Sequence, residues 1–290
     1  MITAAESNTI EKTDVARVRM VDFNYQFTGN LNKFMEILGV TRKIAVQEGT
    51  VLKALKVTGA LVSGAVAEGE IIPLSHYSTQ EVAMGEATLN KWRKATTAEA
   101  ILKGGYDQAV GATTDKLVKD VQKKIRGDLF TYLATGTATA SGATLQPALA
   151  NGWGKLQVLF EDDAVDTVYF LNPTDIATYL GSAQITVQTA FGLNYIENFL
   201  GLGTVILSAN VPAGKYYATA KENIVAYYIN VGAGDIASAF NLTTDETGYI
   251  GINEYANEAR AQVEDLIMSG VTFFAERIDG VVVGTIGAGA

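Results

Sequence analysis

Residues 89–133 read LNKWRKATTAEAILKGGYDQAVGATTDKLVKDVQKKIRGDLFTYL, a polar strand-like segment that runs into a long helical pattern. The apolar residues of the second half recur at steps of three and four, which places them on one face of a helix. From about Asp107 to Leu133, the rise per residue of an α-helix gives a rod of roughly 40 Å. Helices in globular domains average about three turns, so the pattern predicts an extended, plate-like body whose remaining apolar surface is covered by neighbouring copies. The apolar stripe comprises Leu117, Val118, Val121, Ile125, Leu129, Tyr132 and Leu133, and its predicted core positions are Leu117, Val121, Ile125 and Leu129.

Length and composition predict a folded protein. The chain has 290 residues, of which 48% are hydrophobic and 18% are charged, so it can bury a substantial core in one or two domains. Residues 1–20 carry charges but no apolar run of signal-peptide length, and no later segment offers about 18 uninterrupted apolar residues. We therefore expect a protein that is made and stays in the cytoplasm, without a membrane partner.

Side chains that usually carry catalysis or hold metals are scarce. The chain has no cysteine, and His76 is its only histidine, so thiolate sites and the common zinc sites lack ligands. It has no phosphate-binding glycine loop with its lysine, no G-x-S-x-G elbow and no H-E-x-x-H helix. We predict no catalytic residue, no cofactor and no metal; a hydrolase that uses two carboxylates is an alternative. The acidic residues Glu161, Asp162, Asp163 and Asp166 lack the spacing and the glycine of a calcium loop and are interpreted as a solvated turn.

Charge is distributed unevenly along the chain. Of the 31 acidic and 22 basic residues, 16 and 5 follow residue 150, so the two parts carry net charges of +2 and −11. Opposite charges favour contacts between unlike regions of neighbouring copies. A sequence pI near 4.8 and the lack of a basic stripe argue against a protein that grips phosphates. DNA near this chain is expected to make no sequence-specific contact.

The first hundred residues predict a projecting arm. Thr28 is the expected cap of a short helix, and Gly39 is its expected left-handed terminator. Residues 42–49 and 50–62 are predicted strands, and the polar stretch from residue 63 to 87 is too long for an ordinary loop. We expect a two-stranded arm whose returning strand is LNKWRKAT, residues 89–96. Lys91, Trp92 and Arg93 on that strand are the predicted subunit interface, and internal packing of Trp92 is the alternative.

A second region is predicted after the long helix. TGTATASGATLQPALANGWG, residues 135–154, is a low-complexity connection and the expected domain boundary. Buried strands are predicted in VDTVYFL, GTVILS and ENIVAYYI, and Asn172 and Pro173 are the expected cap and first position of a helix. The strands YIGINEY, QVEDLIMSGVTFFAER and GVVVGTI are expected to form a sheet that packs on the long helix.

In this order of parts the chain resembles the major capsid proteins of tailed bacteriophages, which share the Hong Kong 97 head fold. The segments that carry the resemblance are LNKWRKATTAEAI, AFGLNYIENFLGLGTVILS, AFNLTTDETGYIG and FAERIDGVV. The resemblance spans nearly the whole chain and implies an α+β capsid fold. Its implied parts are an N-terminal arm and short helix (1–40), an extended loop with base strands (41–104), the spine helix and connection of a peripheral domain (105–150), an α/β axial domain (151–250) and closing peripheral strands (251–290).

The resemblance implies a structural protein of the virion and not an enzyme. Copies would assemble in the host bacterial cytoplasm into hexamers and pentamers of an icosahedral shell around double-stranded DNA. The implied partners are a separate scaffolding protein, a portal and decoration proteins. No lysine, asparagine and acid can be assigned to a cross-link. The alternative is an encapsulin, a cellular compartment with the same shell fold that encloses a cargo enzyme.

Overall fold

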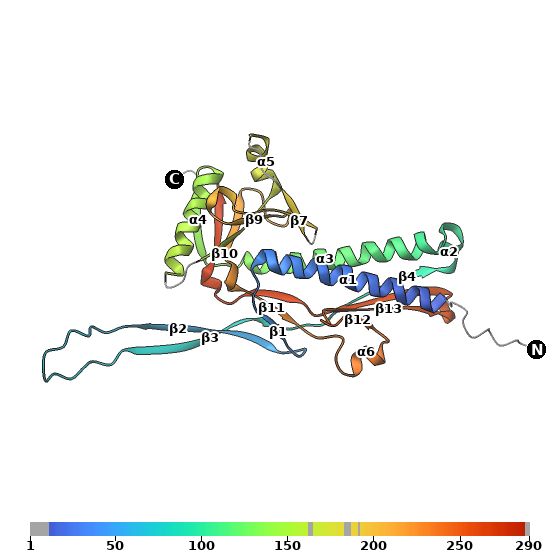
Figure 1. Cartoon of the computed structure of the whole chain (residues 1–290), viewed down its shortest axis with the longest axis horizontal. Coiled ribbons are helices and arrows are strands. Elements are labelled where there is room, and N and C mark those ends of the chain that lie inside the picture. Colours follow the sequence, from blue (N-terminus) through green and yellow to red (C-terminus); the bar gives the residue numbers. More distant parts are fainter. Residues whose placement is uncertain (1–11, 162–164, 183–186, 191, 288–290) are drawn as a thin grey trace, which may run out of the picture.

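The computed structural model describes residues 12–161, 165–182, 187–190 and 192–287. It shows an elongated α+β body with an upper lobe and a long arm that projects from one end (Figure 1). The helices include α1 (Lys12–Leu38), α2 (Ala98–Gly104), α3 (Ala112–Leu133), α4 (Leu145–Leu159), α5 (Pro173–Ser182) and α6 (Asp235–Ala239). The predicted fold class is confirmed.

The N-terminal helix is much longer than the sequence predicted. α1 has 27 residues, and Thr28 is a buried residue in its middle instead of its cap. The apolar stripe simply continues towards the N-terminus, and Asn24 within it donates from Nδ2 to the carbonyl of Thr243 at 2.5 Å. Gly39, with φ of 70°, follows the last helical residue as predicted. The stripe consists of Met20, Phe23, Phe27, Leu31, Phe34, Met35 and Leu38.

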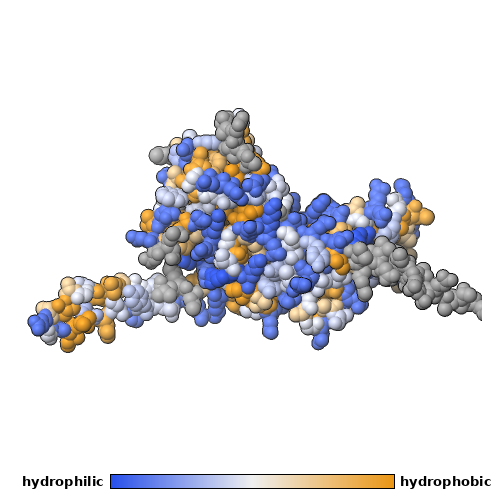
Figure 2. Space-filling model, viewed as in Figure 1, coloured by the Kyte–Doolittle hydropathy of each residue, from blue (hydrophilic) through white to orange (hydrophobic). Residues whose placement is uncertain are grey.

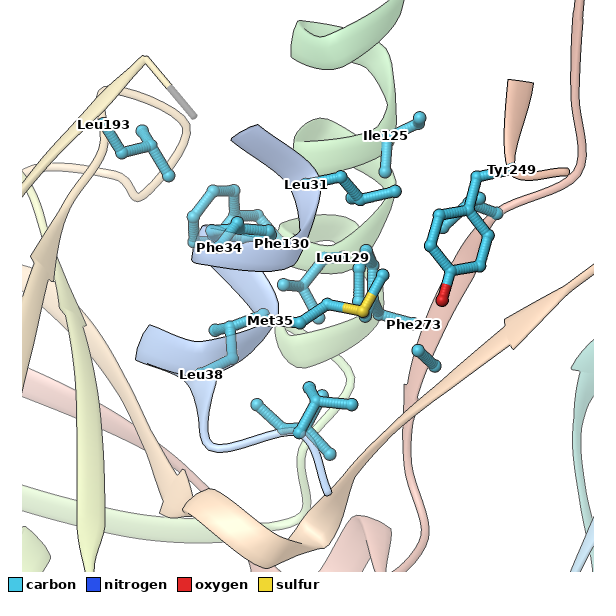
Figure 3. Packing of buried hydrophobic residues seen from close by; sticks show 14 of the residues in the cluster. Leu31, Phe34, Met35, Leu38, Ile125, Leu129, Phe130, Leu193, Tyr249 and Phe273 are labelled. Atoms are coloured by element: carbon cyan, nitrogen blue, oxygen red, sulfur yellow. The ribbon is translucent and has the colours of Figure 1, made fainter. Parts of the chain in front are cut away.

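The predicted long helix is present and is preceded by an unusual turn. α3 spans Ala112–Leu133, and the five residues Asp107–Gly111 form a π-helical turn, η1, at its start. Val121, Ile125 and Leu129 are buried on the inner face of α3, and Leu117 is half-buried against the same core. Figure 3 shows the side chains of α1 and α3 pointing towards one another. Helix α3 therefore supports the body along its length.

Two small sheets lie against these helices. A four-stranded sheet has the order β12-β13-β14-β4, and a three-stranded sheet has the order β1-β11-β15. Phe34 of α1 meets Phe273 of β15 edge to face, with ring centroids 5.8 Å apart. The strands are β1 (Lys43–Ala45), β4 (Asn90–Thr97), β11 (Ile224–Tyr228), β12 (Thr243–Thr244), β13 (Ile250–Asn257), β14 (Gln262–Ser269) and β15 (Thr272–Ala275).

The arm is a hairpin of β2 (Val51–Ala60) and β3 (His76–Glu86), which pair antiparallel. Its base is anchored, because Leu52, Ala54 and Ala87 are buried. The prediction that LNKWRKAT is the returning strand of the arm is wrong. That segment is β4, which pairs over its whole length with β14, because its alternate side chains find a core to face there and none in the arm.

The upper lobe contains a seven-stranded sheet of order β5-β16-β10-β6-β9-β8-β7. Of the three predicted buried strands, two are β6 and β9 of this sheet, and the third is β11 of the three-stranded sheet. The cap of α5 is confirmed, since Asn172 Oδ1 accepts from the Thr174 amide at 3.0 Å. The strands are β5 (Ala138–Gly142), β6 (Thr167–Leu171), β7 (Gln188–Ala190), β8 (Leu193–Ile196), β9 (Thr204–Leu207), β10 (Lys215–Ala220) and β16 (Val281–Ile286).

Two segments of this lobe differ from the prediction. The supposed connection at residues 135–154 contains β5 and most of α4, because Leu145, Ala148 and Leu149 cover the sheet and make the segment more than a linker. The last strand, β16, pairs with β10 and β5 in the upper sheet and not with the strands against α3. The residue boundaries proposed for the domains stay a prediction.

Candidate functional site

The end of the arm, which we call the arm tip (residues 61–75), carries the most exposed apolar side chains of the arm. Ile71 and Leu74 are 94% and 93% exposed, and Leu61 is 82% exposed. Figure 2 shows this apolar surface at the end of the arm. Exposed apolar side chains that gather in one place are typical of interaction surfaces, because their exposure to water costs free energy. Its only charged residues are Glu68 and Glu70.

The predicted interface residues lie on β4 in the body. Lys91 and Arg93 point outwards and are exposed, whereas Trp92 is half-buried and packs against the main core. This placement corresponds to the internal-packing alternative for Trp92. Arg93 Nη1 lies 3.5 Å from Glu264 Oε2 of the same chain, so the guanidinium group already forms an ion pair within one copy.

A buried ion pair lies beneath β4. Lys94 Nζ is 2.7 Å from Asp265 Oδ2, and the side chains are 18% and 1% exposed. Lys94 also donates to the carbonyl of Val110 in η1 at 3.0 Å, and Thr114 donates to Asp265 at 2.9 Å. Burial raises the pKa of Asp265, and the hydrogen bond and charge of Lys94 oppose this rise. The pair thus ties β4, β14 and the π turn together.

Two further carboxylates on the neighbouring strands are also partnered. Glu254 accepts hydrogen bonds from Arg19 of α1 and from the Tyr106 hydroxyl. Hydrogen bonds from Tyr255, Asn257 and Gln262 lower the pKa of Glu264 to about 2. Each carboxylate has structural partners, so the cluster fixes the packing of α1, β4, β13 and β14.

A shallow groove, the β4–α2 groove, lies at the end of the body next to this cluster. Its cavity volume is about 700 Å³, and β4 is the edge strand of its sheet. Of the described residues that line it, two are lysines and none is acidic. They are Lys94, Ala95, Thr96, Thr97, Ala100, Lys103, Gly104, Gln108, Ala109 and Thr113.

The part of the chain that the structure describes has no cluster of metal-ligating side chains and no membrane-crossing helix. Its His, Asp and Glu residues form no group of three that could hold a metal ion. Among its helices, none has the length and apolar character needed to cross a membrane. His76 is exposed on β3. Of the predicted acidic turn, Asp162 and Asp163 lie outside the described residues.

No family model and no curated protein matches the chain. Solved structures do match. The capsid of cyanophage A-1(L) has 12% sequence identity and a TM-score of 0.54 over 87% of this chain and 92% of its own. The chain has the Hong Kong 97-like capsid fold. The capsid of a native GTA particle has 9% sequence identity and a TM-score of 0.54, over 99% of this chain and 94% of its own. The SrpI encapsulin of Synechococcus elongatus PCC 7942 has 12% sequence identity and a TM-score of 0.51, over 87% of this chain and 86% of its own.

Within this Hong Kong 97-like fold, the buried charges were not predicted. Lys94 and Asp265 are cross-strand partners in the β4–β14 register, but they are 171 positions apart in the sequence. A pattern was available in β4, where Trp92, Lys94 and Thr96 alternate with exposed residues. Because side chains alternate along a strand, Lys94 lies on the same face as Trp92. A lysine on this inner face would have predicted a buried acidic partner, since a buried charge without one is costly.

Proposed function

We propose that the chain is the major capsid protein of a tailed-bacteriophage-type particle and assembles into hexamers and pentamers of an icosahedral shell. The observation that carries this proposal is the arm, which presents an exposed apolar tip far from its own body in a chain with a capsid fold. An isolated two-stranded hairpin is marginally stable in water. Lying across an adjacent copy would bury the apolar tip and stabilise both the arm and the assembly.

The proposed contents and partners follow from the same reading. The shell would enclose double-stranded DNA without sequence-specific contact, in agreement with the net charge of −9. Assembly would take place in the host bacterial cytoplasm with a separate scaffolding protein, a portal and decoration proteins. Lys91 and Arg93 on the outside of β4 are proposed to contact acidic residues of another copy. No cofactor, metal or catalytic residue forms part of this proposal.

An encapsulin-type compartment is the second candidate, because the similarity to the SrpI encapsulin is of the same order as the similarity to the phage capsid. The two candidates differ in what the particle encloses. We would express the chain alone and with its neighbouring reading frames, image the products by electron microscopy and treat purified particles with nuclease.

Closed particles filled with nuclease-resistant DNA are the expected result. Closed particles that hold an enzyme and no DNA would instead support the compartment. Small monodisperse oligomers as the only product, under every condition of co-expression, would contradict both candidates.

A further inference from the structure

The open edge of β4, at the end of the body near α2 (Figure 1), carries a row of backbone groups that lack partners. We propose that this edge, with the β4–α2 groove beside it, binds an extended, acidic segment of a different protein, which adds to the sheet as a fifth strand. The proposal goes beyond the shell function and does not depend on it. It concerns the edge of β4, whereas the contact proposed above for Lys91 and Arg93 concerns the outer face.

The pairing of β4 with β14 decides which backbone groups are free. Ala98, which follows β4 directly, donates its amide to the carbonyl of Ala261. In an antiparallel ladder, every second residue directs its amide and carbonyl to the partner strand, and the residues between direct theirs away from it. Among the described residues, none forms a hydrogen bond with the groups that point away. These groups belong to Lys91, Arg93 and Ala95.

A row of free amides and carbonyls is a template for another strand. Proteins normally shorten, interrupt or cover such an edge, because it pairs readily with an extended chain. β4 has eight residues, contains no proline and pairs with β14 in one continuous register. The occupant must be extended, since only a strand presents its amides and carbonyls at the spacing that the edge requires.

The β4–α2 groove provides room for the side chains of an added strand. Residues 94–97 all line the groove, although successive side chains of a strand point to opposite faces. The groove therefore runs along the edge of β4. Its other wall, on α2 and η1, consists largely of small residues that leave space for branched apolar side chains of the occupant, whose burial there favours binding. These small residues include Ala100, Gly104 and Ala109.

The charges of the strand and the groove select an acidic occupant. β4 contains Lys91, Arg93 and Lys94 and no acidic residue. Lys94 is held by Asp265, whereas Lys103 is exposed at the last turn of α2. Lys103 is thus the groove cation that an acidic side chain of the occupant meets. Opposite charges beside an apolar contact fix the register and exclude partners of the wrong sign.

The same charges argue against a second copy of the chain as the occupant. Two β4 edges in contact would bring Lys91 and Arg93 of both copies together, and like charges on paired strands are destabilising. The arm strands β2 and β3 carry two lysines and two glutamates, so they offer no net negative charge. The other described edge strands contain no acidic residue; they are β1, β5, β7, β12 and β15. An acidic strand must therefore come from a different protein.

A defined peptide tests the proposal on the full chain. The probe is fluorescein-labelled EVEVEVE, and fluorescence anisotropy measures its binding. We expect saturable binding that weakens with salt, and no binding of the charge-reversed peptide KVKVKVK. Two further probes are N-methylated at alternate residues, one on each edge of the peptide. Only the probe that lacks the amides facing β4 should lose binding, because the other edge of an added strand stays in water.

Ala95→Pro removes one edge amide from the protein. That amide faces away from β14, so the ladder stays intact and the variant should melt as wild type does. Its affinity for EVEVEVE should fall about tenfold, whereas Ala95→Val, the control that keeps the amide, should bind as wild type does. Lys103→Glu should weaken binding of the same probe. If Ala95→Pro melts early, Ala100→Trp, which fills the groove from an exposed position of α2, takes its place and should also weaken binding.

Hydrogen exchange identifies the occupant. The amides of Lys91, Arg93 and Ala95 should exchange rapidly in the chain alone and slowly once EVEVEVE is bound. Slow exchange of these amides in assemblies of the chain alone would assign the edge to a second copy and overturn the proposal. So would the absence of saturation up to about 1 mM probe, equal effects of the two N-methylated probes, or wild-type affinity in a folded edge or groove variant. Shell formation enters none of these measurements, so such a failure leaves the proposed function intact.

Discussion

Lys94 and Asp265 form an ion pair of 2.7 Å across neighbouring strands, with the carboxylate 1% exposed. Lys94 follows the arm in the sequence, and Asp265 lies 171 positions later on β14. This contact therefore joins β4 to a distant part of the chain. Removing one partner of a buried pair leaves an uncompensated charge, which costs more than the pair itself contributes.

Replacing Lys94 with Met should lower the free energy of unfolding by about 3–5 kcal/mol at pH 7. Burial raises the pKa of Asp265, and a raised folded-state pKa lowers stability as the pH increases. The deficit should therefore shrink between pH 7 and a pH in the acid range, because protonation of Asp265 removes the unpaired buried charge. Urea unfolding at both pH values measures this. Lys53→Met, which removes the exposed pair with Glu81, is the control and should cost less than about 1 kcal/mol. A loss of stability in Lys94→Met that does not change with pH would contradict the conclusion that the charge of Asp265 causes it.

Glu264 should make the protein sensitive to acid. Its folded-state pKa is lowered from 4.5 to about 2, first by the hydrogen bond from Tyr255. A lowered pKa stabilises the fold above the unfolded value, and this stabilisation is lost as the pH falls from about 4.5 towards 2. Glu264→Gln should thus be less stable than wild type at pH 7, and the two should converge near pH 2. The urea midpoints of both proteins, measured between pH 7 and pH 2, test this prediction. A difference in midpoint that stays the same at every pH would refute it.

Ile125→Asp should prevent folding. Ile125 is 4% exposed on the inner face of α3, and an unpaired carboxylate there costs several kcal/mol. We expect insoluble or unfolded protein, judged by solubility and thermal melting. Lys123→Asp introduces the same side chain on the exposed face of the helix and should remain soluble. A soluble Ile125→Asp variant with normal melting would mean that this face is not a core.

Gly39 and Gly29 should respond oppositely to alanine. Gly39 has φ of 70°, and a Cβ atom there would lie 2.3 Å from the Cβ of Lys221, so Gly39→Ala should destabilise by more than about 1 kcal/mol. Gly29 lies exposed within α1, with nothing within 4 Å of its Cβ position. Gly29→Ala should therefore stabilise by about 0.5–1 kcal/mol. Melting curves of the two variants beside wild type check this prediction. Melting temperatures that shift in the same direction in both variants would contradict it.

Shortening the arm should separate folding from assembly. Replacing residues 59–77 with a short Gly/Ser turn removes the exposed tip but keeps the anchored base around Leu52 and Ala54. The melting temperature should stay near that of the full chain, while closed shells disappear from electron micrographs. Val158→Ser, an exposed apolar position on α4, should change neither. Closed particles of normal size from the shortened chain would show that the arm is dispensable.

Local patterns predicted some elements well and others poorly. The α3 stripe and the Gly39 terminator are short-range signals, and both are where the sequence placed them. The start of α1 was misplaced because Thr28 suits a cap in isolation, although its side chain is buried in the core. β4 was assigned to the arm because strand patterns do not name a partner. Pairing of β4 with β14 depends on residues 165 or more positions away.

The candidate site was predictable only in outline. The length and polarity of residues 63–87 indicated an arm, and the exposed tip agrees with that indication. The β4–α2 groove combines a strand edge, a seven-residue helix and a π turn. No periodicity in the sequence marks such a combination, because a single π turn is too short to have a pattern of its own.

The position of β16 governs when the chain can complete its fold during synthesis. β16 lies between β5 and β10, and among the described strands β5 pairs with β16 alone. Until residues 281–286 have left the ribosome, the upper sheet carries an unpaired edge at β10, and β5 has no place in it. A nascent chain therefore cannot present a finished upper lobe to its neighbours. Translation thus sets the order of events: the upper sheet is completed only after residues 281–286 have been made.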